Sequence, residues 1–163
     1  MSEVKSENDA DAMREILEME GTHPDCLSDE TLARMVGCCS DETLNRMAGC
    51  CSGATLARMV GFRNQFPILP KPYTKILTAI ETHGNGFEMG DWHHSCGTTH
   101  CEGGWLIALT NAYELEKKYG PETTALMIAK RSRPDAPLPN LYASKEAALA
   151  FIRARVKEEE AMA

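Results

Sequence analysis

The residues best suited to chemistry in this chain lie between Trp92 and Trp105. This segment holds two of the seven cysteines and three of the five histidines, namely His93, His94, Cys96, His100 and Cys101. Imidazole and thiolate groups bind metal ions, and they also act as bases and nucleophiles in catalysis. Such tight clustering predicts a specific role for the segment, and three roles compete.

The first role is structural. Cys96 and Cys101 would then be small buried thiols, because free cysteine behaves as a small hydrophobic residue. Thr98 or Thr99 would cap the helix that follows. Trp105 lies one helical turn after Cys101, so we expect these two side chains to share the buried face of that helix.

The second role is metal binding. Zinc prefers thiolate and imidazole ligands, and four are at hand in His93, Cys96, His100 and Cys101. The spacing is unusual, because structural zinc sites draw pairs of ligands from separate segments. Adjacent helical residues also point about 100° apart, so His100 and Cys101 converge only if His100 precedes the helix. We therefore expect no cofactor and keep zinc as the alternative.

The third role is nucleophilic catalysis. Cys101 falls in the first turn of a predicted helix, where the helix dipole lowers the pKa of a thiol. An adjacent residue does not share its helical face, so His93 or His83, rather than His100, would be the base. No acidic side chain is evident that would orient the base. Catalysis by Cys101 with His93 as its base is therefore the least supported of the three roles.

The elements that position this segment are predicted to be helices, because apolar residues recur there at helical spacing. One helix follows residue 72 and closes before residues 84–86. A second runs from near Cys101 to Tyr119, and a third starts at Pro121 and ends before Pro134. The last begins after Ser144, a good N-cap residue. Residues 87–92 form a short strand or a loop, and residues 72–157 form a small helical bundle domain.

A 12-residue repeat occupies residues 26–63. Its first two copies start Ser-Asp-Glu-Thr-Leu at Ser28 and Ser40, and a decayed third copy starts at Ser52. Each copy predicts an N-cap, two helical turns and a glycine stop, and a β-solenoid coil is the alternative. Equivalent positions carry Arg34, Arg46 and Arg58, which are candidates for an interaction surface. The repeat cysteines are small buried thiols or a zinc or iron–sulfur cluster: Cys26, Cys38, Cys39, Cys50 and Cys51.

The fold class is thus mainly α, with short helical repeats followed by a helical bundle. Residues 1–25 are an acidic flexible leader, residues 64–71 are a Pro-rich linker, and residues 158–163 are a tail. The formal net charge of −7 argues against nucleic acid as a partner. No apolar run approaches the roughly 18 residues of a membrane span. The odd number of cysteines and the lack of a signal peptide indicate a cytoplasmic protein.

The central motif resembles a family of uncharacterised proteins from tailed bacteriophages and prophages. It comprises Met89-Gly90-x-Trp92-His93 and Cys96-Gly97-Thr98-Thr99-His100-Cys101-x-x-Gly104-Trp105. Residues 76–81, 115–116, 125–128 and 141–149 also look like that family, so the resemblance covers about residues 72–155. Members often carry solenoid repeats upstream. This chain has Glu102-Gly103 where the family pattern has a basic or apolar residue followed by alanine.

The resemblance implies no activity that can be carried over. We therefore expect a non-enzymatic protein-binding module of phage or mobile-element origin, with a host or virion protein as its partner. It would lie in the cytoplasm of a bacterial host or be associated with the virion. The alternative is a small zinc- or cysteine-dependent enzyme that uses the cluster at residues 93–101.

Overall fold

The computed structural model describes residues 53–84 and 86–162 of the chain. The chain divides into two compact units, Met1–Gln65 and Phe66–Ala163. The leader, the first two repeat copies and the five cysteines before residue 52 lie outside the described residues. Arg34 and Arg46 lie there too, and so does the side chain of Arg58. These interpretations therefore remain predictions.

The described part of the first unit is the helix α4 (Gly53–Asn64). This third repeat copy is helical, which agrees with the helical interpretation for this copy and not with a β-coil. The expected stop at Gly61 is wrong, because the helix continues through this glycine to Asn64. Gly61 does not adopt the positive φ of a helix stop, and a side chain there would meet nothing within 4 Å.

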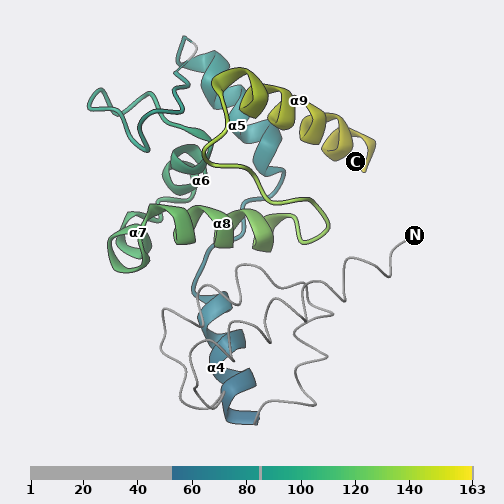
Figure 1. The fold of residues 1–163 in the computed structure, drawn as a ribbon. Coiled ribbons are helices and arrows are strands. Elements are labelled where there is room, and N and C mark those ends of the chain that lie inside the picture. The colour runs from purple at the N-terminus through teal and green to yellow at the C-terminus, as the bar shows by residue number, and fades with distance from the viewer. Residues whose placement is uncertain (1–52, 85, 163) are drawn as a thin grey trace. The chain divides into compact units, whose positions relative to one another are not determined.

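The second unit consists of five helices, so the mainly helical class is confirmed for the described residues. They are α5 (Pro72–Thr82), α6 (Glu102–Thr110), α7 (Tyr113–Tyr119), α8 (Pro121–Ser132) and α9 (Lys145–Ala161). Within this unit, α5 packs against α9 and α6 packs against α8, as Figure 1 shows. Only two isolated β-bridges, both at His100, occur among the described residues outside the helices.

Large apolar side chains from four of these helices and from one loop form the core of the second unit. The fully buried ones are Tyr73, Ile76, Phe87, Leu106, Ile107, Met127, Ile128 and Ile152, together with Phe66 from the segment before α5. Helices this short are unstable in isolation, so burial of these side chains is the main source of their stability. None of the described helices is long and apolar enough to cross a bilayer.

Two helix starts agree with their sequence signals. Pro121 is the first residue of α8, which ends at Ser132, just before Pro134. Ser144 caps α9, because its hydroxyl accepts a hydrogen bond from the Ala147 amide at 3.3 Å. The C-terminal tail expected over 158–163 is helical through Ala161, so α9 is longer than predicted.

The single helix expected from Cys101 to Tyr119 is wrong, because the chain breaks between α6 and α7. Asn111 adopts the left-handed conformation with φ of 53°. The Ala112 amide then donates to the Ile107 carbonyl at 3.0 Å, which closes α6. Asparagine tolerates this conformation better than most residues, and the apolar spacing that continues across the break hides it in the sequence. The break lets α7 take a direction different from that of α6.

The first helix of this unit is capped by a residue from the last helix. Lys71, the N-cap residue of α5, makes no side-chain cap. Glu159 of α9 instead accepts hydrogen bonds from the Tyr73 amide at 3.1 Å and from the Thr74 amide at 2.9 Å. Its carboxylate lies 3.7 Å from the Arg133 guanidinium. A buried anion at a helix N-terminus satisfies amides that have no intrahelical partner.

The Pro-rich segment expected as a linker over 64–71 belongs largely to the second unit. The Leu69 side chain is buried, and the Leu69 amide donates to the Ser132 hydroxyl at 2.9 Å. The Phe66 ring is buried and lies 5.6 Å from the Tyr119 ring. The domain boundary therefore falls between Gln65 and Phe66 rather than at residue 72.

Candidate functional site

The segment before α6 folds into a tight turn. The Gly97 amide donates to the His94 carbonyl at 3.0 Å, and the His94 amide donates to the Thr99 carbonyl at 2.9 Å. Gly97 has φ of 71°, a conformation that glycine adopts without strain. The His100 amide donates to the Gly86 carbonyl at 3.3 Å and ties this turn to the loop after α5.

Cys96 lies at the tip of this turn and is exposed. The expectation that Cys96 is buried is therefore wrong. The positive φ of Gly97 allows a tight turn here, and this turn places Cys96 in solvent. The Thr98 hydroxyl donates to the Cys96 sulfur at 3.4 Å. Hydrogen bonds from Thr98 and Thr99 stabilise the thiolate and lower the pKa of Cys96 to about 6. Cys96 is thus a solvent-accessible thiol that ionises readily.

Cys101 is buried and caps α6. Its sulfur accepts a hydrogen bond from the Gly104 amide at 3.3 Å, so the expected cap by Thr98 or Thr99 is wrong. Burial raises the pKa of Cys101, and this effect exceeds the opposing effect of the helix amides. The expectation that the helix start activates this thiol is therefore wrong. Trp105 is also buried, as expected, and its indole donates to the Gly86 carbonyl at 3.0 Å.

Three side chains form a hydrogen-bonded chain beside Trp105. The Nε2 atom of His93 lies 3.0 Å from Oε1 of Glu116, and its Nδ1 lies 2.9 Å from Nδ1 of His100. Because a carboxylate only accepts, His93 donates from Nε2 to Glu116, and of the two facing Nδ1 atoms one donates and the other accepts. Burial, followed by the nearby His93, lowers the pKa of His100 and favours its neutral form.

Glu116 is the acidic group that sequence reasoning missed. It lies 23 residues after His93, on a helix whose charges suggest only a solvated face. No local spacing connects the two positions. The break at Asn111 starts α7 in a new direction, and Glu116 of that helix lies beside His93.

The structure brings together only part of the predicted metal-ligand set. His93 and His100 present two imidazole nitrogens to each other, as two ligands of one metal would. The exposed Cys96 lies at the turn tip, and the sulfur of Cys101 faces the Gly104 amide and the Trp92 carbonyl. Among residues 53–84 and 86–162, no three or more His, Cys, Asp or Glu side chains are grouped so that they could hold a metal ion.

Glu102, the first residue of α6, is a buried carboxyl group. The residue is 1% exposed, and neither carboxyl oxygen has a hydrogen-bond partner among the described residues. Burial raises the pKa of Glu102 to about 8. The next two residues must be glycine, because a Cβ atom would lie 2.5 Å from the Trp92 ring at Gly103 and 1.8 Å from the Trp92 carbonyl at Gly104.

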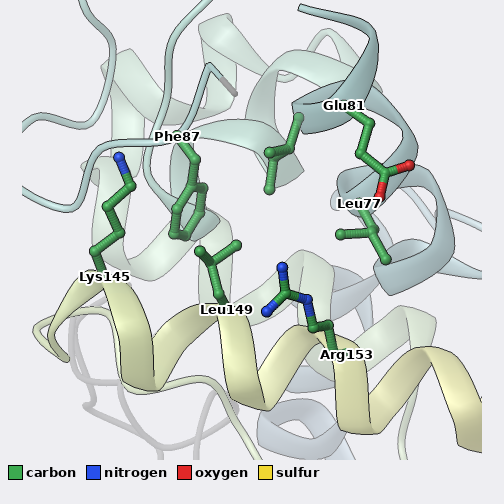
Figure 2. A pocket seen from close by; sticks show the side chains of 7 residues that line it. Leu77, Glu81, Phe87, Lys145, Leu149 and Arg153 are labelled. Atoms are coloured by element: carbon green, nitrogen blue, oxygen red, sulfur yellow. The ribbon is translucent and has the colours of Figure 1, made fainter. Parts of the chain in front are cut away.

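A second candidate site is an open pocket between α5 and α9, with a volume of about 270 Å³ (Figure 2). It is lined by Leu77, Ile80, Glu81, Phe87, Lys145, Leu149 and Arg153. We call it the α5/α9 groove. Ile80 and Phe87 are buried in its floor, whereas Leu77 and Leu149 are half-buried. The groove therefore exposes apolar surface to solvent.

Comparison of the chain with family models, with curated proteins and with solved structures gave no match. The resemblance to phage proteins therefore remains a prediction. What the chain binds must be argued from its own side chains.

The charges of the α5/α9 groove are not all neutralised within the protein. Lys145 forms an ion pair with Glu88, with Nζ and Oε1 at 2.7 Å. Arg153, in contrast, makes no hydrogen bond or ion pair with any other described residue. In Figure 2 its guanidinium points between Leu149 and Leu77. This unpaired cation beside open apolar surface distinguishes the groove from the rest of the α5–α9 contact.

Proposed function

We propose that the protein is a non-enzymatic protein-binding module and that its helical unit binds a partner at the α5/α9 groove. One observation carries this proposal: apolar side chains and an unpaired arginine share an open pocket on the surface. When a partner covers the exposed part of the half-buried leucines, burial of this apolar surface stabilises the complex by about 25 cal/mol per Å². Arginine is also one of the residues most often found as a binding hot spot in protein interfaces.

The partner is a host or virion protein on this proposal, and the resemblance to phage and prophage proteins is its support. The protein would act in the host cytoplasm or on the virion. The repeat would present a second surface through Arg34, Arg46 and Arg58. The groove and the repeat lie in different units, so each surface can be tested without altering the other.

Paired variants of α9 test the proposal. We expect that Leu149→Glu abolishes capture of a specific host or virion protein, because it places a charge on the apolar wall of the groove. Ala154→Glu is the control, since Ala154 is exposed on the same helix and does not line the groove. The captured protein is then purified, and its Kd is measured with the wild type and both variants. Equal Kd values for all three proteins would exclude the groove as the binding surface.

A second candidate function, a zinc- or cysteine-dependent activity at residues 93–101, is favoured by the chain from Glu116 through His93 to His100. A carboxylate that accepts from one histidine nitrogen orients the other nitrogen toward a metal. Two nitrogens on a tetrahedral zinc lie about 3.4 Å apart, so the pair would need to open slightly. The test is the zinc content of the purified protein. One zinc ion per chain that is lost in His93→Ala but kept in His94→Ala would support this candidate.

A further inference from the structure

The α5/α9 groove contains three features that a ligand can contact: an apolar pocket, the guanidinium of Arg153 and the carboxylate of Glu81. Together they limit the chemical class of the ligand. The pocket volume of about 270 Å³ is below the roughly 300–1,000 Å³ of pockets that enclose drug-sized ligands. The pocket therefore holds one or two apolar side chains rather than a long apolar face. The buried floor of Ile80 and Phe87 cannot offer hydrogen bonds, so the inserted group must be hydrocarbon.

The second feature is the guanidinium of Arg153. Arg153 is exposed, so its guanidinium is accessible to a ligand, and an arginine binds a carboxylate through two parallel N–H donors. Lys145 does not compete for the anion, because its ammonium is already paired with Glu88. The groove thus offers one guanidinium, which suffices for a single anionic group such as a carboxylate.

The third feature is Glu81, which lines the groove from α5, whereas Leu149 and Arg153 line it from α9 (Figure 2). Its carboxylate is exposed and makes no ion pair with a described residue. It repels a second anionic group and accepts a hydrogen bond from an N–H donor of the ligand.

We infer that the groove binds the carboxyl-terminal residue of a partner polypeptide, with an aliphatic side chain in the pocket and the terminal carboxylate on Arg153. The inference rests on the proposed binding function. In a polypeptide, only the carboxyl-terminal residue carries an apolar side chain, an amide N–H and a carboxylate on the same carbon atom. The side chain fits the pocket, the N–H fits Glu81 and the carboxylate fits Arg153. An internal aspartate or glutamate places its charge on the side chain that would have to fill the apolar floor.

The test uses the full chain and two short peptides. Acetyl-Ala-Ala-Leu with a free carboxylate is compared with the same peptide as a carboxamide, and binding is followed by NMR shifts of Leu77, Phe87 and Leu149. We expect the acid to bind at least tenfold more tightly than the amide. Arg153→Gln should remove this preference. Lys157→Gln should retain it, because Lys157 is exposed on the same helix and lies outside the groove.

Each other outcome contradicts a specific step. Equal binding of acid and amide at the groove overturns carboxylate recognition but leaves the groove as a binding surface. A preference that survives in Arg153→Gln overturns the role of Arg153. Tight groove binding of acetyl-Ala-Glu-Ala-amide shows that an internal acidic residue suffices and overturns the terminal residue. If neither leucine peptide shifts the groove resonances, the inference and the proposed binding surface both fail.

Discussion

Cys96 and Cys101 are only five residues apart, yet their surroundings act on the two thiols in opposite directions. Hydrogen bonds from Thr98 and Thr99 lower the pKa of the exposed Cys96, whereas burial raises the pKa of Cys101. The motif shows that two thiols are present but not which one faces solvent. The turn at Gly97 decides that question, and its geometry depends on the pairing of residues 94 and 99.

We predict that Cys96 is alkylated by iodoacetamide much faster than Cys101 at pH 7. The pH dependence should have its midpoint near 6, the pKa of Cys96, because the thiolate is the reactive form. Peptide mapping by mass spectrometry separates these two thiols from the other five. Thr98→Val removes the hydroxyl donor to the sulfur and should raise this midpoint. Equal modification of Cys101 in the folded protein would contradict the prediction.

Glu102 makes the stability of the helical unit depend on pH. Its pKa is raised from 4.5 to about 8 in the folded unit, so the folded state keeps a proton that the unfolded state has lost between these values. The stability that Glu102 contributes is therefore fully present below about pH 4.5, falls as the pH rises, and is lost above about pH 8. We predict that Glu102→Gln removes this dependence and makes the protein more stable than the wild type at pH 9.

Urea unfolding at pH 5, 7 and 9 measures this effect. Both tryptophans of the chain, Trp92 and Trp105, lie in the second unit, so their fluorescence reports on that unit. Glu160→Gln is the control, because Glu160 is exposed on α9. If the wild type and Glu102→Gln lose stability equally between pH 5 and 9, Glu102 is not the responsible group.

At the scale of elements, the start of α6 and the segment around Trp92 are packed as one piece. The absence of side chains at Gly103 and Gly104 lets the Trp92 ring and carbonyl reach the helix backbone. Two adjacent glycines in the sequence indicate close packing here, but they do not identify Trp92 as the neighbour. That contact also holds His93, the residue after Trp92, beside His100, which lies in the chain just before α6.

We predict that Gly104→Ala destabilises the helical unit by about 3 kcal/mol or more, because overpacking against backbone cannot be relieved by a change of rotamer. A Cβ atom there would lie 1.8 Å from the Trp92 carbonyl oxygen. Gly90→Ala is the matched control, since a Cβ atom added at Gly90 would meet nothing within 4 Å. A Gly104→Ala variant within about 0.5 kcal/mol of the wild type would show that the segment can move away.

Helix ends are predictable where one residue determines them. Pro121 and Ser144 begin or cap their helices as the sequence indicates, because proline geometry and a serine hydroxyl act within one turn. The break at Asn111 is not predictable, since apolar residues keep their helical spacing on both sides of it. Contacts between distant residues, such as Glu116 with His93, leave no local pattern in a single sequence.

At the scale of the molecule, the helical unit includes the segment from Phe66 to Lys71. We predict that a fragment of residues 66–163 folds cooperatively, because the core of this unit is drawn from its own helices. A fragment of residues 72–163 should be less stable by several kcal/mol, since it lacks the buried Phe66 and Leu69. Urea unfolding of both fragments measures the difference. Equal stability would place the boundary at residue 72 after all.

The cap that Glu159 provides for α5 affects how the protein folds during synthesis. Glu159 lies 86 residues after Tyr73, the amide of which it binds. At roughly 5–20 residues per second, a ribosome takes about 4–17 s to make the intervening chain. During that time α5 has neither its cap nor its partner helix α9, and its apolar face is open to solvent. A nascent chain interrupted before residue 159 would therefore expose the α5 side of the core, where chaperones and proteases act.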